Sequence, residues 1–390
     1  MKNFALGSLA IAIFVISTLV FLGSMTEVRI VADEDSSTLR AQAQSRSLRS
    51  TPLEAGKLLD LVSSKQNPIT RAKVEFGKEL FFDASLSKHG KTSCASCHSL
   101  SRDVANPPIL GEFVAGKDEG VSDCASCHLR DQSGVDRFTF SQGDNATPHP
   151  KLLNVQTVLN SGFFKHYTWS GEVGSIADEA KRSFEAKHKH ALSLDEVVAR
   201  VANDPKYTEF VDSNLSIDTI ANAIEAYVKT LVTYGAYDRF MDGDDDALSH
   251  QAKRGLANFM RFGCSGCHGG VALGGTTLQH FPLRAFAFFY ELRLNESLFD
   301  QLRSSDSRLP FDNSGGFLGR DDALKFRVPT LRNVTKTSPY FHNGAVEKIY
   351  EAVDIMARHQ LGRRLSDEQI SEIVAFLRSL EGEIVEYELK

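Results

Sequence analysis

The longest uninterrupted apolar stretch of the chain lies at its N-terminus. Residues 4–22 carry no charged side chain, and charged residues stand on both sides of them. The run is longer than the roughly 7–15 residues of a secretory h-region and approaches the ~20 that cross a bilayer. Residues 1–24 are therefore expected to be a cleaved export signal or an uncleaved membrane anchor, with a buried core helix as the third alternative.

Beyond this segment, apolar positions recur mostly at helical spacing. Ser193 and Ser366 each begin a capping-box pattern ahead of such a run. A third helix is predicted by a stripe of five residues, Ile217, Ile220, Ile224, Val228 and Leu231. Alternating strand patterns are scarce, so the sequence predicts a mainly α fold.

Two polar tracts divide the chain. Residues 31–65 are rich in Ser, Asp, Gln and Arg without a sustained apolar period, which predicts a tether over residues 25–70. The acidic run Met241–Asp246 contains a glycine and predicts a boundary between domains at residues 71–241 and 246–390. This run lacks the spaced ligand series of a calcium loop.

Composition mainly excludes function classes. The chain has 390 residues, of which 42% are hydrophobic and 24% charged. This balance excludes a disordered chain and a multi-span transporter. There are 44 Lys and Arg against 50 Asp and Glu, a net charge of −6. Nucleic acid is therefore not expected as a partner.

All six cysteines fall within three copies of one pattern, C-x-x-C-H. The two thiols of each copy can add to the two vinyl groups of one haem, and the histidine that follows then lies under the iron as its proximal ligand. A thioredoxin-like dithiol and a zinc site also use C-x-x-C, but neither needs a histidine after every copy. The pattern predicts three covalent haems c, and two at minimum, on Cys94, Cys97 and His98, on Cys124, Cys127 and His128, and on Cys264, Cys267 and His268.

The sixth ligand of each iron decides between electron transfer and chemistry. A thioether ligand raises the haem potential, whereas an open or weakly held position lets peroxide reach the iron. Other histidines are plentiful. Met1 and Met25 lie in or beside the N-terminal segment, which leaves the methionines Met241, Met260 and Met356. The residues alone leave the choice among these ligands open.

Several segments resemble the bacterial dihaem cytochrome c peroxidases, the family that also contains the MauG-type enzymes. They span about residues 71–385 in the family's order. The segments are Gly77–Asp83, Thr92–His98, Arg254–Leu256, Gly263–Gly269, Val328–Val334, Pro339–Gly344 and Met356–Arg363. The resemblance implies two cytochrome c-like haem domains after the N-terminal segment.

The resemblance also implies a role for the first and third haems. The haem on the first motif would be the low-potential peroxidatic centre, and the haem on the third the high-potential electron store with Met356 as its distal ligand. The alternative for Met356 is a core methionine, with His359 and His342 as substitute ligands. A tyrosine in this position would indicate the MauG branch, so the methionine favours the peroxidase branch.

Three further assignments follow from the same resemblance. Trp169, the only tryptophan, would relay electrons between the haems, with core packing as the alternative. Glu185 would be the distal proton-transfer group, with a surface glutamate as the alternative. A calcium ion between the domains would be held by Asn145, Thr337 and Pro339.

The second motif departs from the family pattern. It lies in an insert where the family carries a distal histidine soon after the first motif, and its haem is expected close to the peroxidatic one. The distal ligation of the first haem is therefore open among an empty position, His89, His149 and His166.

The activity implied is the reduction of hydrogen peroxide to water in the periplasm. Glu185 would move a proton, and Trp169 would pass an electron from the third haem to the first. The electron donor would be a small cytochrome c or cupredoxin, or quinol if the N-terminus is an anchor, and a homodimer is left open. The alternative functions are a multihaem electron-transfer cytochrome without peroxidase activity and a MauG-like oxidase of a protein partner.

Overall fold

The structure is a computed structural model that describes residues 35–100, 135, 143–144, 149–283, 309–313 and 315–389. The predicted signal or anchor, the second haem motif at Cys124–His128 and the predicted calcium ligand Asn145 lie outside the described residues. Within the described ranges, no helix has the length and apolar character needed to cross a bilayer. The described elements are mostly helices, as predicted.

The first half of the molecule is built on two helices that approach each other closely. Helix α4 (Arg71–Phe82) packs against α9 (Ile217–Thr230). At Gly77 a Cβ would overlap the carbonyl oxygen of Ala223, so only glycine permits this distance between the helices. Around the pair lie α5 (Cys94–Cys97), α7 (Ile176–Glu185), α8 (Leu194–Asn203), η1 (Ala84–Leu86), η2 (Ser161–Phe163) and η3 (Pro205–Tyr207).

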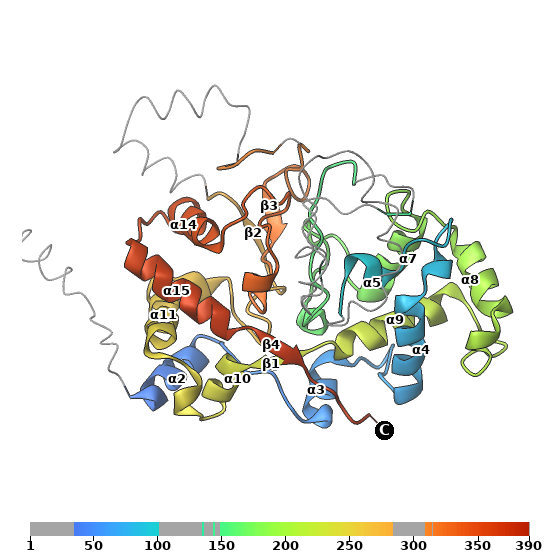
Figure 1. Cartoon of the computed structure of the whole chain (residues 1–390), viewed down its shortest axis with the longest axis horizontal. Coiled ribbons are helices and arrows are strands. Elements are labelled where there is room, and N and C mark those ends of the chain that lie inside the picture. The colour runs from blue at the N-terminus through green and yellow to red at the C-terminus, as the bar shows by residue number, and fades with distance from the viewer. Residues whose placement is uncertain are drawn as a thin grey trace, which may run out of the picture.

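The second half uses the same arrangement (Figure 1). Helix α11 (His250–Arg261) packs against α15 (Asp367–Ser379). A Cβ at Gly255 would overlap the carbonyl oxygen of Glu372. The other elements of this half are α10 (Ala236–Met241), α14 (Ile349–His359), η4 (Asp245–Ala247), η5 (Cys264–Gly266) and η6 (Val334–Lys336).

Two short antiparallel sheets complete the fold. Strand β2 (Leu278–His280) pairs with β3 (Lys325–Arg327). Strand β1 (Thr233–Gly235), which follows α9, pairs with β4 (Gly382–Ile384), which follows α15, and this sheet lies between the halves (Figure 1).

The chain passes from the hydrophobic core of the first half to that of the second half before it reaches the acidic run, where the boundary was predicted. Tyr237, Phe240 and Met241 are buried with α11 and α15 in the second core, whereas Leu231 belongs to the first. The chain therefore passes between the cores at residues 232–235, ahead of the predicted boundary at Met241–Asp246.

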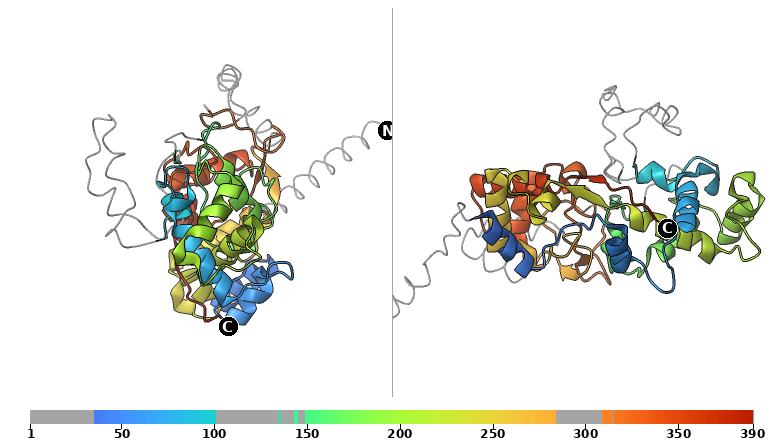
Figure 2. Two further views of the ribbon diagram at one scale, coloured as in Figure 1. Left: turned by 90° about the vertical axis from the view of Figure 1, so that its right-hand side faces the viewer. Right: turned by 90° about the horizontal axis from the view of Figure 1, so that it is seen from below.

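The predicted tether is wrong over residues 36–62. These residues include α2 (Ser36–Ser45) and α3 (Ala55–Val62). Leu39 and Ala43 are buried in the second core, and Figure 2 shows α2 lying beside the helices of that half. Leu58 and Val62 are buried in a smaller cluster. Each helix buries only two residues one turn apart, so its apolar pattern is too short to stand out from the polar residues around it.

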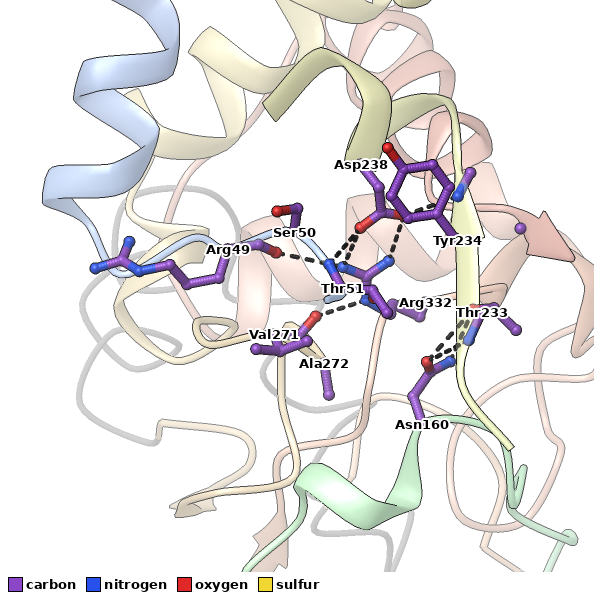
Figure 3. Close-up of polar contacts among 12 residues, drawn as sticks. Arg49, Ser50, Thr51, Asn160, Thr233, Tyr234, Asp238, Val271, Ala272 and Arg332 are labelled. Atoms are coloured by element: carbon purple, nitrogen blue, oxygen red, sulfur yellow. Dashed lines mark hydrogen bonds and ion pairs between the residues drawn. The ribbon is translucent and has the colours of Figure 1, made fainter. Parts of the chain in front are cut away.

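A buried ion pair joins four distant segments of the chain (Figure 3). The Arg332 guanidinium binds both carboxylate oxygens of Asp238, at 2.8 and 2.9 Å, and neither side chain reaches solvent. Arg332 also donates to the carbonyl oxygens of Val271 and Arg49. Asp238 accepts from the backbone N–H of Thr51, at 2.8 Å. One charge pair is thus shared by four segments: the N-terminal arm (residues 36–62), α10, the loop after the third haem motif and residues 328–334.

We expect Arg332→Met to lower the free energy of unfolding by about 3–5 kcal/mol, because it leaves the Asp238 carboxylate buried without a cation. The measurement is the urea midpoint at unchanged m-value.

The control variant is Arg358→Met, which removes a surface ion pair with Asp354 on α14 and should cost about 0.5 kcal/mol or less. Equal losses in the two variants would contradict the central role of Arg332.

Candidate haem sites

The first haem motif forms a single helical turn. In α5 the N-cap Ser93 and Ser96 make a reciprocal capping box, and the His98 N–H donates to the Cys94 carbonyl oxygen at 2.9 Å. Asp144 and Ser87 fix the loop that leads into the turn, because Ser87 Oγ donates to Asp144 Oδ1 at 2.7 Å and accepts from the Thr92 N–H at 3.1 Å. The turn therefore presents both thiols and the histidine from one rigid segment.

A cavity of about 570 Å³ opens beside this turn, and Cys94, Cys97 and His98 line it. Its size lies within the usual range of cofactor pockets, and Phe81, Phe164 and other apolar side chains form much of the wall. Burial raises the pKa of the Cys94 thiol to about 12, which makes this thiol a poor free nucleophile. The residues fit a covalently attached haem better than a redox dithiol.

The third motif places its histidine ring against a backbone carbonyl oxygen. Gly263, with φ of 96°, turns the chain into η5, and the His268 N–H donates to the Cys264 carbonyl oxygen at 3.0 Å. His268 Nδ1 lies 3.2 Å from the carbonyl oxygen of Leu273. Burial lowers the pKa of His268 to about 4, so the ring is neutral. Since Nδ1 carries the proton toward that carbonyl, Nε2 is the nitrogen left to bind iron.

The two halves repeat a sequence that neither composition nor periodicity had indicated. Residues 155–160 and 328–333 both read V-x-T-x-x-N. Asn160 and Asn333 both adopt a left-handed conformation, with φ of 62° and 58°, and each precedes a 3-10 turn. Both side chains bond to Thr233 Oγ1, from Nδ2 at 3.0 Å in each case, so the repeats meet at the strand that connects the halves.

The repeat continues at the same offset into the segments that follow. Tyr167 bridges to Val173 as Tyr340 bridges to Val346. Within these turns Trp169 and His342 occupy equivalent positions, and their rings meet edge to face with centroids 6.3 Å apart. One residue of each half thus contacts its counterpart.

The same offset relates α7 to α14. Ile176 and Ile349 begin the two helices, and Ser183 on α7 corresponds to Met356 on α14. Ser183 lines the cavity of the first motif. Met356 is half-buried at the corresponding place in the second half.

Trp169 lies at the wall of the first cavity where the second half meets it. Its Nε1–H donates to the Asn154 carbonyl oxygen at 2.9 Å, and its own carbonyl oxygen accepts from the Arg327 N–H at 2.9 Å. The structure therefore brings Trp169 together with Cys94, Cys97 and His98.

Glu185 does not join these residues. It is the last residue of α7, its side chain is exposed, and it does not line the cavity. The residues of α7 that do line it are Ile176, Glu179, Ala180, Arg182 and Ser183.

The carboxylate that sequence reasoning missed is Glu179. Lys189 Nζ lies 2.7 Å from Glu179 Oε1 and 3.0 Å from Ser183 Oγ, and all three side chains line the cavity. Helical periodicity could have indicated Glu179, because residues 176, 179, 180 and 183 share one face, whereas Glu185 lies half a revolution from Ile176.

Among the three histidines predicted as alternative distal ligands, only His149 lines the cavity. Its ring centroid lies 4.5 Å from that of His188, another lining residue. Burial, with the neighbouring His188 and Lys189, lowers the pKa of His149 to about 4. His149 is therefore placed to act as a neutral group near the first haem site.

His342 and His359, the substitute ligands predicted for the third haem, differ in burial. His342 is buried, and its Nε2 lies 3.0 Å from the side-chain oxygen of Asn313. His359 is half-buried at the end of α14.

The predicted calcium ligands Thr337 and Pro339 lie in the segment between η6 and Tyr340. Among the described residues, no group of three or more His, Cys, Asp or Glu side chains suits a metal ion.

Comparisons with known proteins identify the family of the chain. The sequence profile of the family described as di-haem cytochrome c peroxidase matches residues 71–120 and 112–246. Cytochrome c551 peroxidase of Nitrosomonas europaea is 31% identical over 323 residues, which are 81% of this chain and 81% of that protein. Cytochrome c551 peroxidase of Pseudomonas aeruginosa is 32% identical over 336 residues, 83% of each chain.

A solved structure shares the fold. It is the crystal structure of a MauG-like protein associated with microbial copper homeostasis, with a TM-score of 0.57 and 21% identity over 86% of this chain and 93% of that one. On the similarity to the two peroxidases over most of its length, the chain belongs to the di-haem cytochrome c peroxidase family and is a c-type haem peroxidase.

Proposed function

We propose that the chain reduces hydrogen peroxide to water in the cavity beside Cys94–His98, with two electrons and two protons consumed for each peroxide. The observation that carries this proposal is that one cavity combines the haem-attachment residues with a paired acid and base and with the only tryptophan. Haem bound there supplies the cleavage of the O–O bond, and the protein supplies access, orientation and protons.

The proton-transfer role fits Glu179 better than Glu185. Glu179 faces the cavity from α7, and Lys189 and Ser183 surround its carboxylate, so the group is held in place at the cavity wall. A carboxylate in this position can take a proton from one peroxide oxygen and return it to the other. The Lys189 ammonium stabilises negative charge that develops on the departing oxygen.

We expect Glu179→Gln to lower peroxide turnover by about 10²–10³, because general acid–base groups contribute on that order. The haem absorption spectra should stay nearly unchanged, since Glu179 is not an iron ligand in this assignment. Steady-state turnover with a reduced small cytochrome c measures the effect.

Glu185→Gln is the matched control, because the same carboxylate is removed from the opposite face of the same helix. It should keep nearly wild-type turnover. If Glu185→Gln loses activity while Glu179→Gln keeps it, the assignment to Glu179 is wrong.

The electron store is proposed on the third motif with Met356 as distal ligand. Two observations support this. His268 Nδ1 lies 3.2 Å from the Leu273 carbonyl oxygen, which leaves Nε2 available to ligate iron, and Met356 repeats the position at which Ser183 lines the first cavity. A thioether from Met356 would favour ferrous iron on the third motif, whereas Ser183, at the corresponding place, offers only a hydroxyl, which would be a poor iron ligand. Electrons would pass through Trp169, which contacts His342 of the second half.

Met356→His should keep the third haem six-coordinate and lower its potential, because imidazole stabilises ferric iron more than a thioether does. Activity with a high-potential donor should collapse, and stronger reductants should restore part of it. A redox titration followed with the near-infrared Met-to-iron charge-transfer band is the measurement.

Met241→Leu serves as control, since Met241 is buried in the second core and should leave both the band and the potential unchanged. If the charge-transfer band survives in Met356→His, Met356 is a packing residue, and the assignment of the third haem as the electron store is wrong.

We propose that Cys124–His128 hold a third haem and that calcium binds near Thr337 and Pro339. We also propose a periplasmic location, with a small cytochrome c or cupredoxin as electron donor. Three complete motifs without a spare cysteine support the haem count. The apolar residues 4–22 support export, either with signal cleavage or with retention as an anchor.

Intact mass of the purified chain should show three haem additions. Cleavage after the export signal would appear in the same spectrum as loss of the N-terminal residues. Two additions, with Cys124 and Cys127 free or joined as a disulfide, would refute the third haem.

A further inference from the structure

Arg327 is a buried cation that the proposed reaction does not use. It stands at the end of β3 in the second half of the molecule, with 3% of its surface exposed, and it lines the cavity of the first haem motif. Burial lowers its pKa to about 10, so the guanidinium is still charged near neutral pH. A charge enclosed in this way calls for a partner of opposite sign.

The protein itself supplies only partial compensation. Arg327 Nε donates to the Thr168 carbonyl oxygen at 3.2 Å, and the guanidinium carbon lies 4.7 Å from the centre of the Phe164 ring. Its Nη1 is buried and has no hydrogen-bond partner. Within the described part of the chain no carboxylate forms an ion pair with Arg327.

The carboxylates that line the same cavity in the described residues are already paired. Glu172 and Glu179 line the same cavity, but Glu172 binds Arg182 at 2.9 Å and Glu179 binds Lys189 at 2.7 Å. The other large buried guanidinium, Arg332, has both oxygens of Asp238. Among the described residues Arg327 therefore has no anionic partner, and an anion inside the cavity would supply one.

We propose that Arg327 binds a carboxylate of the haem attached to Cys94 and Cys97. Haem c carries two propionate groups, and a guanidinium fork pairs with a carboxylate through two parallel N–H···O bonds. A residue of the second half would then hold the cofactor of the first half. The inference requires haem at the first motif and does not require peroxidase activity, so each can fail without the other.

The test is whether Arg327→Gln shifts the urea midpoint of unfolding in opposite directions in chains with and without the first haem. In the haem-loaded chain, Arg327→Gln should lower the urea midpoint of unfolding, because it removes the partner of a buried carboxylate. In the Cys94→Ala/Cys97→Ala chain, which cannot attach the first haem, the same substitution should raise the midpoint, because it removes a buried charge without a partner. The coupling between the two sites is read from this double-mutant cycle.

Arg182→Gln is the matched control. Arg182 lines the same cavity but is exposed and paired with Glu172, so its substitution should shift the midpoint little and with the same sign in both backgrounds. An equal decrease for Arg327→Gln in both backgrounds would assign Arg327 to packing and overturn the proposal. A reversal that follows Cys264→Ala/Cys267→Ala instead would place the carboxylate on the third haem, which also overturns it.

A second measurement needs only the haem-loaded chain. The propionate bending modes of the resonance Raman spectrum report hydrogen bonding to the haem carboxylates. These modes should shift in Arg327→Gln, return toward wild type in Arg327→Lys, and stay unchanged in Arg182→Gln. Unchanged modes in Arg327→Gln would refute the contact even if the variant lacking the first haem does not fold.

Discussion

The pairing of Arg332 with Asp238 is the constraint on which the rest of the structure depends. A buried guanidinium can be accommodated only when nearly all its donors are satisfied, and here the acceptors come from segments far apart in the sequence. One of them, Val271, lies just after the third haem motif. The geometry of that motif is thus tied to the N-terminal arm and to the connection between the halves (Figure 3).

The two halves of the chain share one backbone arrangement, but different side chains face the two haem sites. Trp169 and His342 share a position, and so do Ser183 and Met356. An oxidisable indole stands beside the first cavity, and a thioether stands in the second half where the first has a hydroxyl. The difference in chemistry between the halves can therefore come from a few substitutions within a common backbone, without a different fold.

Features that depend on a few neighbouring residues could be recognised from the sequence. The haem motifs are short and need particular residues at fixed spacing, and Trp169 is unique, so both could be identified without coordinates. Glu185 was assigned from its approximate match to the family's distal glutamate, but a helix places residues by angle, and the cavity is lined by Glu179. The arm at residues 36–62 was assigned as a tether because its few apolar residues become informative only when the surfaces that bury them are known.

The docking of the N-terminal arm also constrains the order of folding. The Gly270 N–H donates to the Ser47 carbonyl oxygen, and Arg332 donates to that of Arg49, so the arm binds partners more than 200 residues later in the chain. During synthesis the arm emerges before α11 and residues 328–334 and must wait for them before it can bury Leu39 and Leu48. Closing so long a loop is slow, so the arm is expected to dock late, once the second core that buries it has formed.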